Sequence, residues 1–140
     1  MKLSRIMHAL LVAARFSIPL SLVANAMASP QPQQQEPVSF VSGGVGEDEE
    51  RAIERLVPDY PLQLLFVTKG EPNQYLADVK VQIKDKSGNV VLDTTADGPF
   101  LLAKMPLGKY SISADHEGAV KRQTIHVGGK AQRVVFVWDR

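Results

Sequence analysis

The sequence contains no cysteine, and this absence excludes three kinds of feature. Disulfide bonds, thiolate metal sites and a lipid-modified cysteine all need the sulfur that this chain lacks. A chain without disulfides has to be stabilised by its hydrophobic core, even if it is exported to an oxidising compartment.

Aromatic residues are scarce, at 6% of the chain. Five of them fall in predicted strands and are expected to pack in the core: Phe66, Phe100, Tyr110, Phe136 and Trp138. Tyr60 and Tyr75 are the loop aromatics that remain for stacking against a sugar. A carbohydrate- or small-ligand-binding module is therefore an alternative interpretation, and an exposed apolar patch would favour it.

Catalytic signatures are missing as well. No serine, histidine and acid stand at the spacing of a recognised nucleophilic motif, so the sequence predicts a protein that is not an enzyme. It assigns no catalytic residue, no cofactor or cofactor-binding residue and no metal ligand.

One long apolar run is present, at the start of the chain. Met1 to Arg5 is basic, the run from Ile6 to Ala28 follows, and it ends in two small-x-small sites. This pattern predicts a signal peptide over residues 1–28, cleaved after Ala28 or, as second choice, after Ala26. A retained membrane anchor is the alternative, but Arg15 interrupts the run, and a span needs roughly 20 mostly apolar residues. The predicted location is periplasmic or secreted, with membrane contact only during export.

Cleavage would change the sign of the net charge. Removing residues 1–28 takes away three of the 16 basic residues and none of the 15 acidic ones, so the charge falls from +1 to about −2. A mature chain of this charge has no footprint for nucleic acid, which requires a clustered basic face.

The next two segments differ sharply in composition. Residues 29–46 are rich in Pro, Gln and Gly and are predicted to form a flexible segment. Residues 47–58 begin with four acids and end at Pro58, which predicts a short amphipathic helix with Ile53, Leu56 and Val57 on one face. The glycines of "SGGVG" could suggest a phosphate loop, but no Gly-Lys-Ser/Thr follows and the acids would repel phosphate. A joint leading into a charge-capped helix is the better interpretation.

Residues 59–140 alternate between strand and turn patterns. In the first half of a predicted hairpin, Ala77, Val79, Val81 and Ile83 point one way and polar residues point the other. "DKSGN", "ADGP", "MPLG", "EG" and "GG" are turn signals that separate the later strands. About seven strands at short, even spacing predict an all-β protein, an antiparallel β-sandwich of prealbumin-like or Ig-like type with one short N-terminal α-helix.

Two predicted strands are apolar on both faces, Leu62 to Val67 and Val134 to Trp138. Such strands need cover on both sides. The helix is expected to supply it from outside the sheet. The expected contacts run from Ile53, Leu56 and Val57 to Leu65, Val67, Val135 and Val137.

The run from Ala77 to Trp138 resembles the carboxypeptidase regulatory-like domain, a transthyretin-like β-sandwich. The matching residues are Val79, Val81, Gly88, Thr94, Thr95, Asp97-Gly98-Pro99-Phe100, Met105-Pro106-Leu107-Gly108-Lys109-Tyr110 and Val134 to Trp138. Leu107 and Pro99 depart from the usual residues at two turns. The "SGGVG" segment followed by an acidic helix is also similar to small exported proteins of Gram-negative bacteria that carry this domain alone. The resemblance implies a fold and is nearly silent on function, because these are turn and core residues.

The same fold family includes a hydroxyisourate hydrolase with a Tyr-Arg-Gly-Ser ending. This chain has Trp138-Asp139-Arg140 there, so a transthyretin-like hydrolase is the least favoured alternative.

Two histidines follow the predicted signal. His116 stands between Asp115 and Glu117, and His126 points outward from a strand. These four side chains could meet across a hairpin, where a metal would need about three or four convergent ligands. Exposed histidines without a metal are the more ordinary interpretation, and the sequence leaves metal binding by His116 and His126 open.

These observations predict a non-catalytic periplasmic module with a protein-interaction or structural role in the cell envelope. Its partner would be an unknown envelope protein or glycan. The fold carries this prediction by analogy alone.

Overall fold

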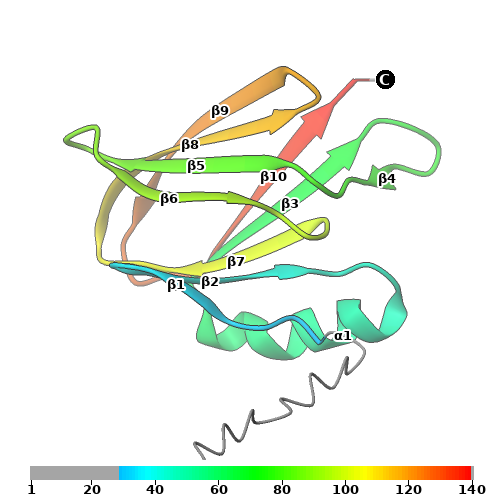
Figure 1. Cartoon of the computed structure of the whole chain (residues 1–140), viewed down its shortest axis with the longest axis horizontal. Coiled ribbons are helices and arrows are strands. Elements are labelled where there is room, and N and C mark those ends of the chain that lie inside the picture. The colour runs from blue at the N-terminus through cyan, green and yellow to red at the C-terminus, as the bar shows by residue number, and fades with distance from the viewer. Residues whose placement is uncertain (1–28, 140) are drawn as a thin grey trace, which may run out of the picture.

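Two β-sheets lie face to face in the computed structural model, which describes residues 29–139 (Figure 1). The six-stranded sheet runs in the order β1 (Gln33–Gln35), β2 (Val38–Gly43), β7 (Phe100–Lys104), β3 (Leu62–Thr68) and β10 (Gln132–Trp138), with β4 (Gln74–Tyr75) paired to the end of β3. The four-stranded sheet runs in the order β6 (Val90–Thr95), β5 (Lys80–Asp85), β8 (Gly108–His116) and β9 (Ala119–Val127).

The predicted short helix is present as α1 (Glu47–Leu56), followed by the 3-10 turn η1 (Val57–Asp59). Four acids occupy its first turn and Arg55 its last, an arrangement that complements the helix dipole. The helix lies along the outer side of the six-stranded sheet, away from the four-stranded sheet (Figure 1).

The main core fills the space between the sheets. Alternate residues of each strand point into it, as the period of two requires. The six-stranded sheet contributes Val38, Phe40, Leu62, Leu64, Phe66, Leu101, Ala103, Val134, Phe136 and Trp138. The four-stranded sheet contributes Val81, Ile83, Leu92, Tyr110, Ile112, Ala114, Ile125 and Val127, and Val79 precedes β5. The hairpin predicted from the alternation after Ala77 is therefore confirmed in β5 and β6.

A second, smaller cluster lies under the helix. Ile53 is completely buried against the outer face of the six-stranded sheet, where Val41, Leu65, Val67, Phe100 and Leu102 form the floor. The expected contacts with Leu65 and Val67 are confirmed. Those with Val135 and Val137 are wrong, because the helix covers β2, β7 and β3 and leaves the outer face of β10 exposed.

The mostly β composition with two sheets and one short helix agrees with the prediction, but the strand count does not. Residues 29–139 form ten strands rather than about seven. The additional ones are β1, β2 and β4, which are short or carry weak alternation.

The expectation of a purely antiparallel sandwich is also wrong. β10 pairs with β3 in parallel, from Gln132↔Leu62 to Trp138↔Thr68. These two strands are both rich in apolar residues, and they lie far apart in the sequence. Because their own patterns carry no information on direction, the parallel register could not be predicted from them.

The segment 29–46 is not a flexible tether over its whole length. It contains β1 and β2, and β2 inserts between β1 and β7 with Val38, Phe40 and Val41 buried. The Pro/Gln composition of the first residues concealed a strand whose apolar residues begin only at Val38. The folded unit therefore begins well before residue 59, and the predicted domain boundary there is wrong.

Side chains join the sheets along the open sides of this sandwich-like arrangement. The Gln35 side-chain amide donates to the Asp93 carbonyl and accepts from the Asp93 N–H, both at 2.9 Å, as a neighbouring strand would. On the opposite side, Trp138 Nε1 donates to the Ala119 carbonyl at 2.8 Å. These bonds fix β1 to β6 and β10 to β9.

The predicted signal peptide, residues 1–28, lies outside the described residues. Within residues 29–139, no helix has the length and apolar character needed to cross a membrane.

Candidate functional site

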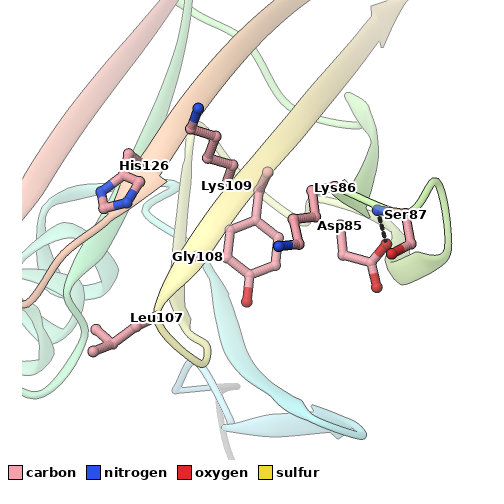
Figure 2. Close-up of a pocket in the computed structure, with 8 residues that line it drawn as sticks. Asp85, Lys86, Ser87, Leu107, Gly108, Lys109 and His126 are labelled. Atoms are coloured by element: carbon pink, nitrogen blue, oxygen red, sulfur yellow. Dashed lines mark hydrogen bonds between the residues drawn. The ribbon is translucent and has the colours of Figure 1, made fainter.

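A hollow with a volume of about 480 Å³ lies at one end of the four-stranded sheet (Figure 2). Three segments meet there: the β5–β6 turn, the start of β8 and the end of β9. Its lining is Asp85, Lys86, Ser87, Leu107, Gly108, Lys109, Tyr110 and His126. Lys109 and His126 are register partners on β8 and β9, and together with Lys86 they make the lining basic.

The β5–β6 turn is held by Asp85. Its Oδ1 accepts hydrogen bonds from the N–H groups of Ser87 and Asn89, each at 2.9 Å, and Gly88 has a φ of 85°. An Asx turn with glycine in the left-handed region is the local structure that "DKSGN" favours. The Asp85 carboxylate is therefore engaged in the turn and not presented to a ligand.

Tyr110 forms the floor of the hollow and belongs to the core. Its hydroxyl donates to the Pro106 carbonyl at 2.6 Å, so the side chain closes the turn formed by Met105 to Gly108. Burial, with a smaller contribution from the Asp85 charge, raises the pKa of Tyr110 above its ordinary value of 10.0. A hydroxyl that stays protonated and is already bonded is suited to structure rather than to acid–base chemistry.

The hollow can attract anions but lacks an activated nucleophile. Of the side-chain hydrogen bonds within residues 29–139, none joins a serine hydroxyl to a histidine ring. Ser87 contributes its N–H to the turn, and the Lys86, Lys109 and His126 side chains are exposed. The arrangement offers positive charge and donors to a ligand, without a base positioned to activate an attacking group.

The two histidines do not meet. His126 pairs with Lys109 and the neighbour of His116 across the hairpin is Ala119, which places the histidines at opposite ends of the β8–β9 ladder. The His116 ring packs edge-on against Trp138, with ring centroids 5.8 Å apart. Among the described residues, no three His, Asp or Glu side chains gather as metal ligands would.

In the "SGGVG" segment, a backbone N–H is bound by the carboxylate of Glu49 from α1. The Gly44 N–H donates to Glu49 Oε1 at 2.9 Å, so a carboxylate of α1 holds the amide that a phosphate would require. Gly43 belongs to β2, and a side chain there would displace the Glu49 carboxylate from its place beside Gly44. The charge-capped start of α1 is what the sequence favoured; the flexible joint before it is replaced by the end of a strand.

The two loop aromatics, Tyr60 and Tyr75, differ in burial. Tyr60 packs against the cluster under the helix, while Tyr75 is 53% exposed and its ring meets the edge of Phe100 at a centroid distance of 5.7 Å. Tyr75, Val67 and Val137 form one row across β4, β3 and β10.

A feature that sequence reasoning missed lies beside this row. β10 has a strand neighbour on one side only, and its outer face carries Val135 and Val137, which are 39% and 36% exposed. The signal was visible in the sequence, since Val134 to Trp138 is apolar on both faces. It was interpreted there as a surface that the helix would cover.

No family model matches the sequence, and the search of curated proteins finds no match.

Proposed function

We propose that this protein is an exported, non-catalytic module of the cell envelope that binds an extended segment of a partner protein along β10. The observation that carries the proposal is the exposed outer face of an edge strand, formed by Val135 and Val137. Val137 and Tyr75 flank Val67, which belongs to the cluster under the helix, so apolar side chains continue from that cluster to the edge of the sheet.

The backbone of β10 also has an open side. The Gln132 N–H bonds to Pro61 and the Trp138 carbonyl accepts from Lys69, so the even-numbered residues direct their polar groups toward β3. The intervening residues Arg133, Val135 and Val137 direct theirs away from it. On that side, the Val135 carbonyl accepts from Gln123 Nε2 at 3.3 Å. The remaining groups can pair with an added strand.

An added strand would gain from both features. Main-chain bonds along an exposed edge give affinity, and alternate side chains give specificity. A free edge with apolar residues is otherwise a site of aggregation, which proteins avoid by covering or charging it. Occupation of β10 by a partner segment accounts for an edge that carries valines where charged residues would protect it.

Export and a family resemblance complete the proposal. The basic start, apolar run and small-x-small sites of residues 1–28 support a cleaved signal peptide and a periplasmic or secreted location. The order of strands and turns after Ala77 supports a prealbumin-like sandwich of the carboxypeptidase regulatory-like type. Mass spectrometry of the mature protein should give an N-terminus at Ser29 or Met27, and an extracytoplasmic protein that retains Met1 would contradict cleavage.

The binding proposal is tested by affinity capture from the periplasm, followed by mass spectrometry. The double variant Val135→Lys/Val137→Lys should lose the captured protein, because two charges would have to be buried beside the added strand. The matched control is Val45→Lys/Val90→Lys, which makes the same change at two exposed valines outside β10. Equal capture by both variants, or capture of further copies of this chain alone, would overturn the proposal.

A further inference from the structure

We infer that the outer face of the four-stranded sheet is a second binding surface, which takes an acidic polysaccharide. This face is distinct from β10 and does not depend on the function proposed for that strand. Because alternate residues of β5, β8 and β9 face the core, the residues between them form one continuous outer surface. Those outward residues are Lys80, Gln82, Lys84, Lys109, Ser111, Ser113, Asp115, Val120, Arg122, Thr124 and His126.

The charge of this surface is positive. Its cations are Lys80, Lys84, Lys109 and Arg122, and Lys86 adds another from the adjoining turn. The acids that face them are Asp115, which is the register partner of Lys80, Asp93 on β6, which is opposite Gln82, and Asp85 in the turn. Asp115 and Asp85 accept backbone hydrogen bonds from Gly118 and Ser87. Asp93 lies in the same row as Arg122, so the excess positive charge is carried by Lys84, Lys109 and Lys86, toward the end next to the larger hollow.

The central cations are not neutralised by ion pairs. Among residues 29–139, the pairs within 4.0 Å involve Arg51, Lys69 and His116, so Lys84, Lys109 and Arg122 have no carboxylate at that distance. Exposed and unpaired cations of this kind are available to an anionic ligand at little desolvation cost.

The face is hollowed at two places. A small hollow of about 80 Å³ lies between β5, β8 and β9 and is lined by Gln82, Lys84, Ser111, Ser113 and Arg122. The larger hollow begins at Lys109 and His126, two residues from Ser111 along β8 and therefore on the same face (Figure 2). From the row of Arg122 to that of Lys109 is four residues along β8, about 13 Å at strand spacing. A ligand that fills both hollows has to be extended and to carry negative charge at more than one point.

The side chains between the cations select among extended polyanions. Ser111, Ser113, Thr124 and Gln82 offer hydroxyl and amide groups that both donate and accept, which is what the hydroxyls of a sugar require. Val120 is the single apolar side chain among the outward residues of β5, β8 and β9. Protein interfaces have apolar cores depleted of charge, and single-stranded nucleic acids are bound on aromatic platforms. The outward residues of β5, β8 and β9 include no Phe, Tyr or Trp, and Tyr110 at the floor of the larger hollow is held by its bond to Pro106. An acidic glycan fits this polar, cationic surface best.

The negative charge on the other side of the molecule favours binding of a polyanion at the outer face of the four-stranded sheet. Residues 47–59, on the outer side of the six-stranded sheet, hold six acids against Arg51 and Arg55. A molecule that is acidic on one side and basic on the other is steered so that the basic side meets a polyanion.

Isothermal titration of the mature protein with polygalacturonate at low ionic strength tests the inference, with neutral dextran as the uncharged comparison. Binding to polygalacturonate and none to dextran is expected, with affinity that falls as salt rises. The variant Lys84→Gln/Arg122→Gln should bind at least about tenfold more weakly, because it removes two charge-assisted contacts.

The matched control is Lys104→Gln/Lys121→Gln, which makes the same charge change on side chains that point away from this face. Lys104 shares the outer side of the six-stranded sheet with Leu102, and Lys121 is the register partner of the buried Ala114. The control should stay within about twofold of the native affinity, since distant exposed charges contribute little.

Equal weakening of both variants would reduce the effect to net charge and overturn the inference. So would the absence of binding to polygalacturonate, or tighter binding to duplex DNA or to phosphatidylglycerol vesicles than to polygalacturonate. None of these outcomes affects β10, because the Val135→Lys/Val137→Lys variant should bind polygalacturonate normally. Loss of glycan binding in that variant would place the site elsewhere.

Discussion

Gly98 shows how a single residue sets the approach of two strands. The N–H of the preceding residue, Asp97, donates a hydrogen bond to Ser42 Oγ at 3.0 Å, which holds the turn before β7 against β2. A Cβ on Gly98 would lie 2.4 Å from the backbone of Gly43. The Asp-Gly pair that the sequence marks as a turn is therefore also the point at which β2 docks.

Substitution of Gly98 by alanine should consequently destabilise the protein. We expect a loss of about 1–3 kcal/mol in the free energy of unfolding, because the new methyl group forces backbone apart rather than displacing a flexible side chain. Ser87→Ala, an exposed change of similar size, should stay within about 0.5 kcal/mol. Denaturant titration of both variants measures this, and equal midpoints would show that the close approach is not required.

Tyr110 provides a prediction in pH. Its pKa is raised in the folded state by burial, so above pH 10.0 the unfolded chain loses the phenol proton more readily than the folded one. The contribution of Tyr110 is fully present below that pH and is lost as pH rises through the folded pKa. Tyr110→Phe should cost about 0.5–1.5 kcal/mol at neutral pH, through the bond to Pro106.

The same variant should lose stability less steeply above pH 10 than the native protein. Denaturant midpoints at about pH 9 and about pH 11 measure the difference, and the other tyrosines and the lysines cancel because both proteins contain them. Parallel loss in the two proteins would mean that Tyr110 does not titrate as a buried group.

At the scale of elements, the sequence predicts those that depend on near neighbours in the chain and misses those that depend on pairing with a distant strand. The β5–β6 hairpin and α1 were predictable, because the alternation after Ala77 and the acids before Ile53 act between near neighbours in the chain. β2 was not, since Val38 to Val41 become a strand only when β7 offers an edge more than fifty residues away. The direction of β10 was hidden for the same reason. The basic outer face was visible in the alternation of β5, β8 and β9, but its continuity depends on register.

The helix is the element that stabilises the second cluster. Ile53→Ala should lower the free energy of unfolding by about 2–5 kcal/mol, because Ile53 is fully buried and the vacated space is bounded by a rigid sheet. Glu54→Ala, the exposed neighbour, should change it by no more than about 0.5 kcal/mol. Thermal melts with a hydrophobic dye serve as the measurement. A melt unchanged by Ile53→Ala would show that α1 is not docked on the sheet.

At the scale of the whole molecule, the two sheets present different surfaces to their surroundings. The six-stranded sheet exposes an apolar edge strand beside an acidic helix, and the four-stranded sheet exposes polar and cationic side chains. The core between them is continuous, so each surface is carried by a rigid scaffold. The two proposed binding surfaces, for a partner protein and for an acidic glycan, therefore lie on different sheets.

The central claim is that β10 receives a strand from a partner protein, and photo-crosslinking in the intact cell tests it most directly. A photoreactive residue is placed singly at Val135, Val137, Val45 or Val90, all of which are exposed. The account predicts a covalent adduct to one other protein from Val135 and Val137 and none from Val45 and Val90. No adduct at any position, or the same adducts at all four, would contradict it.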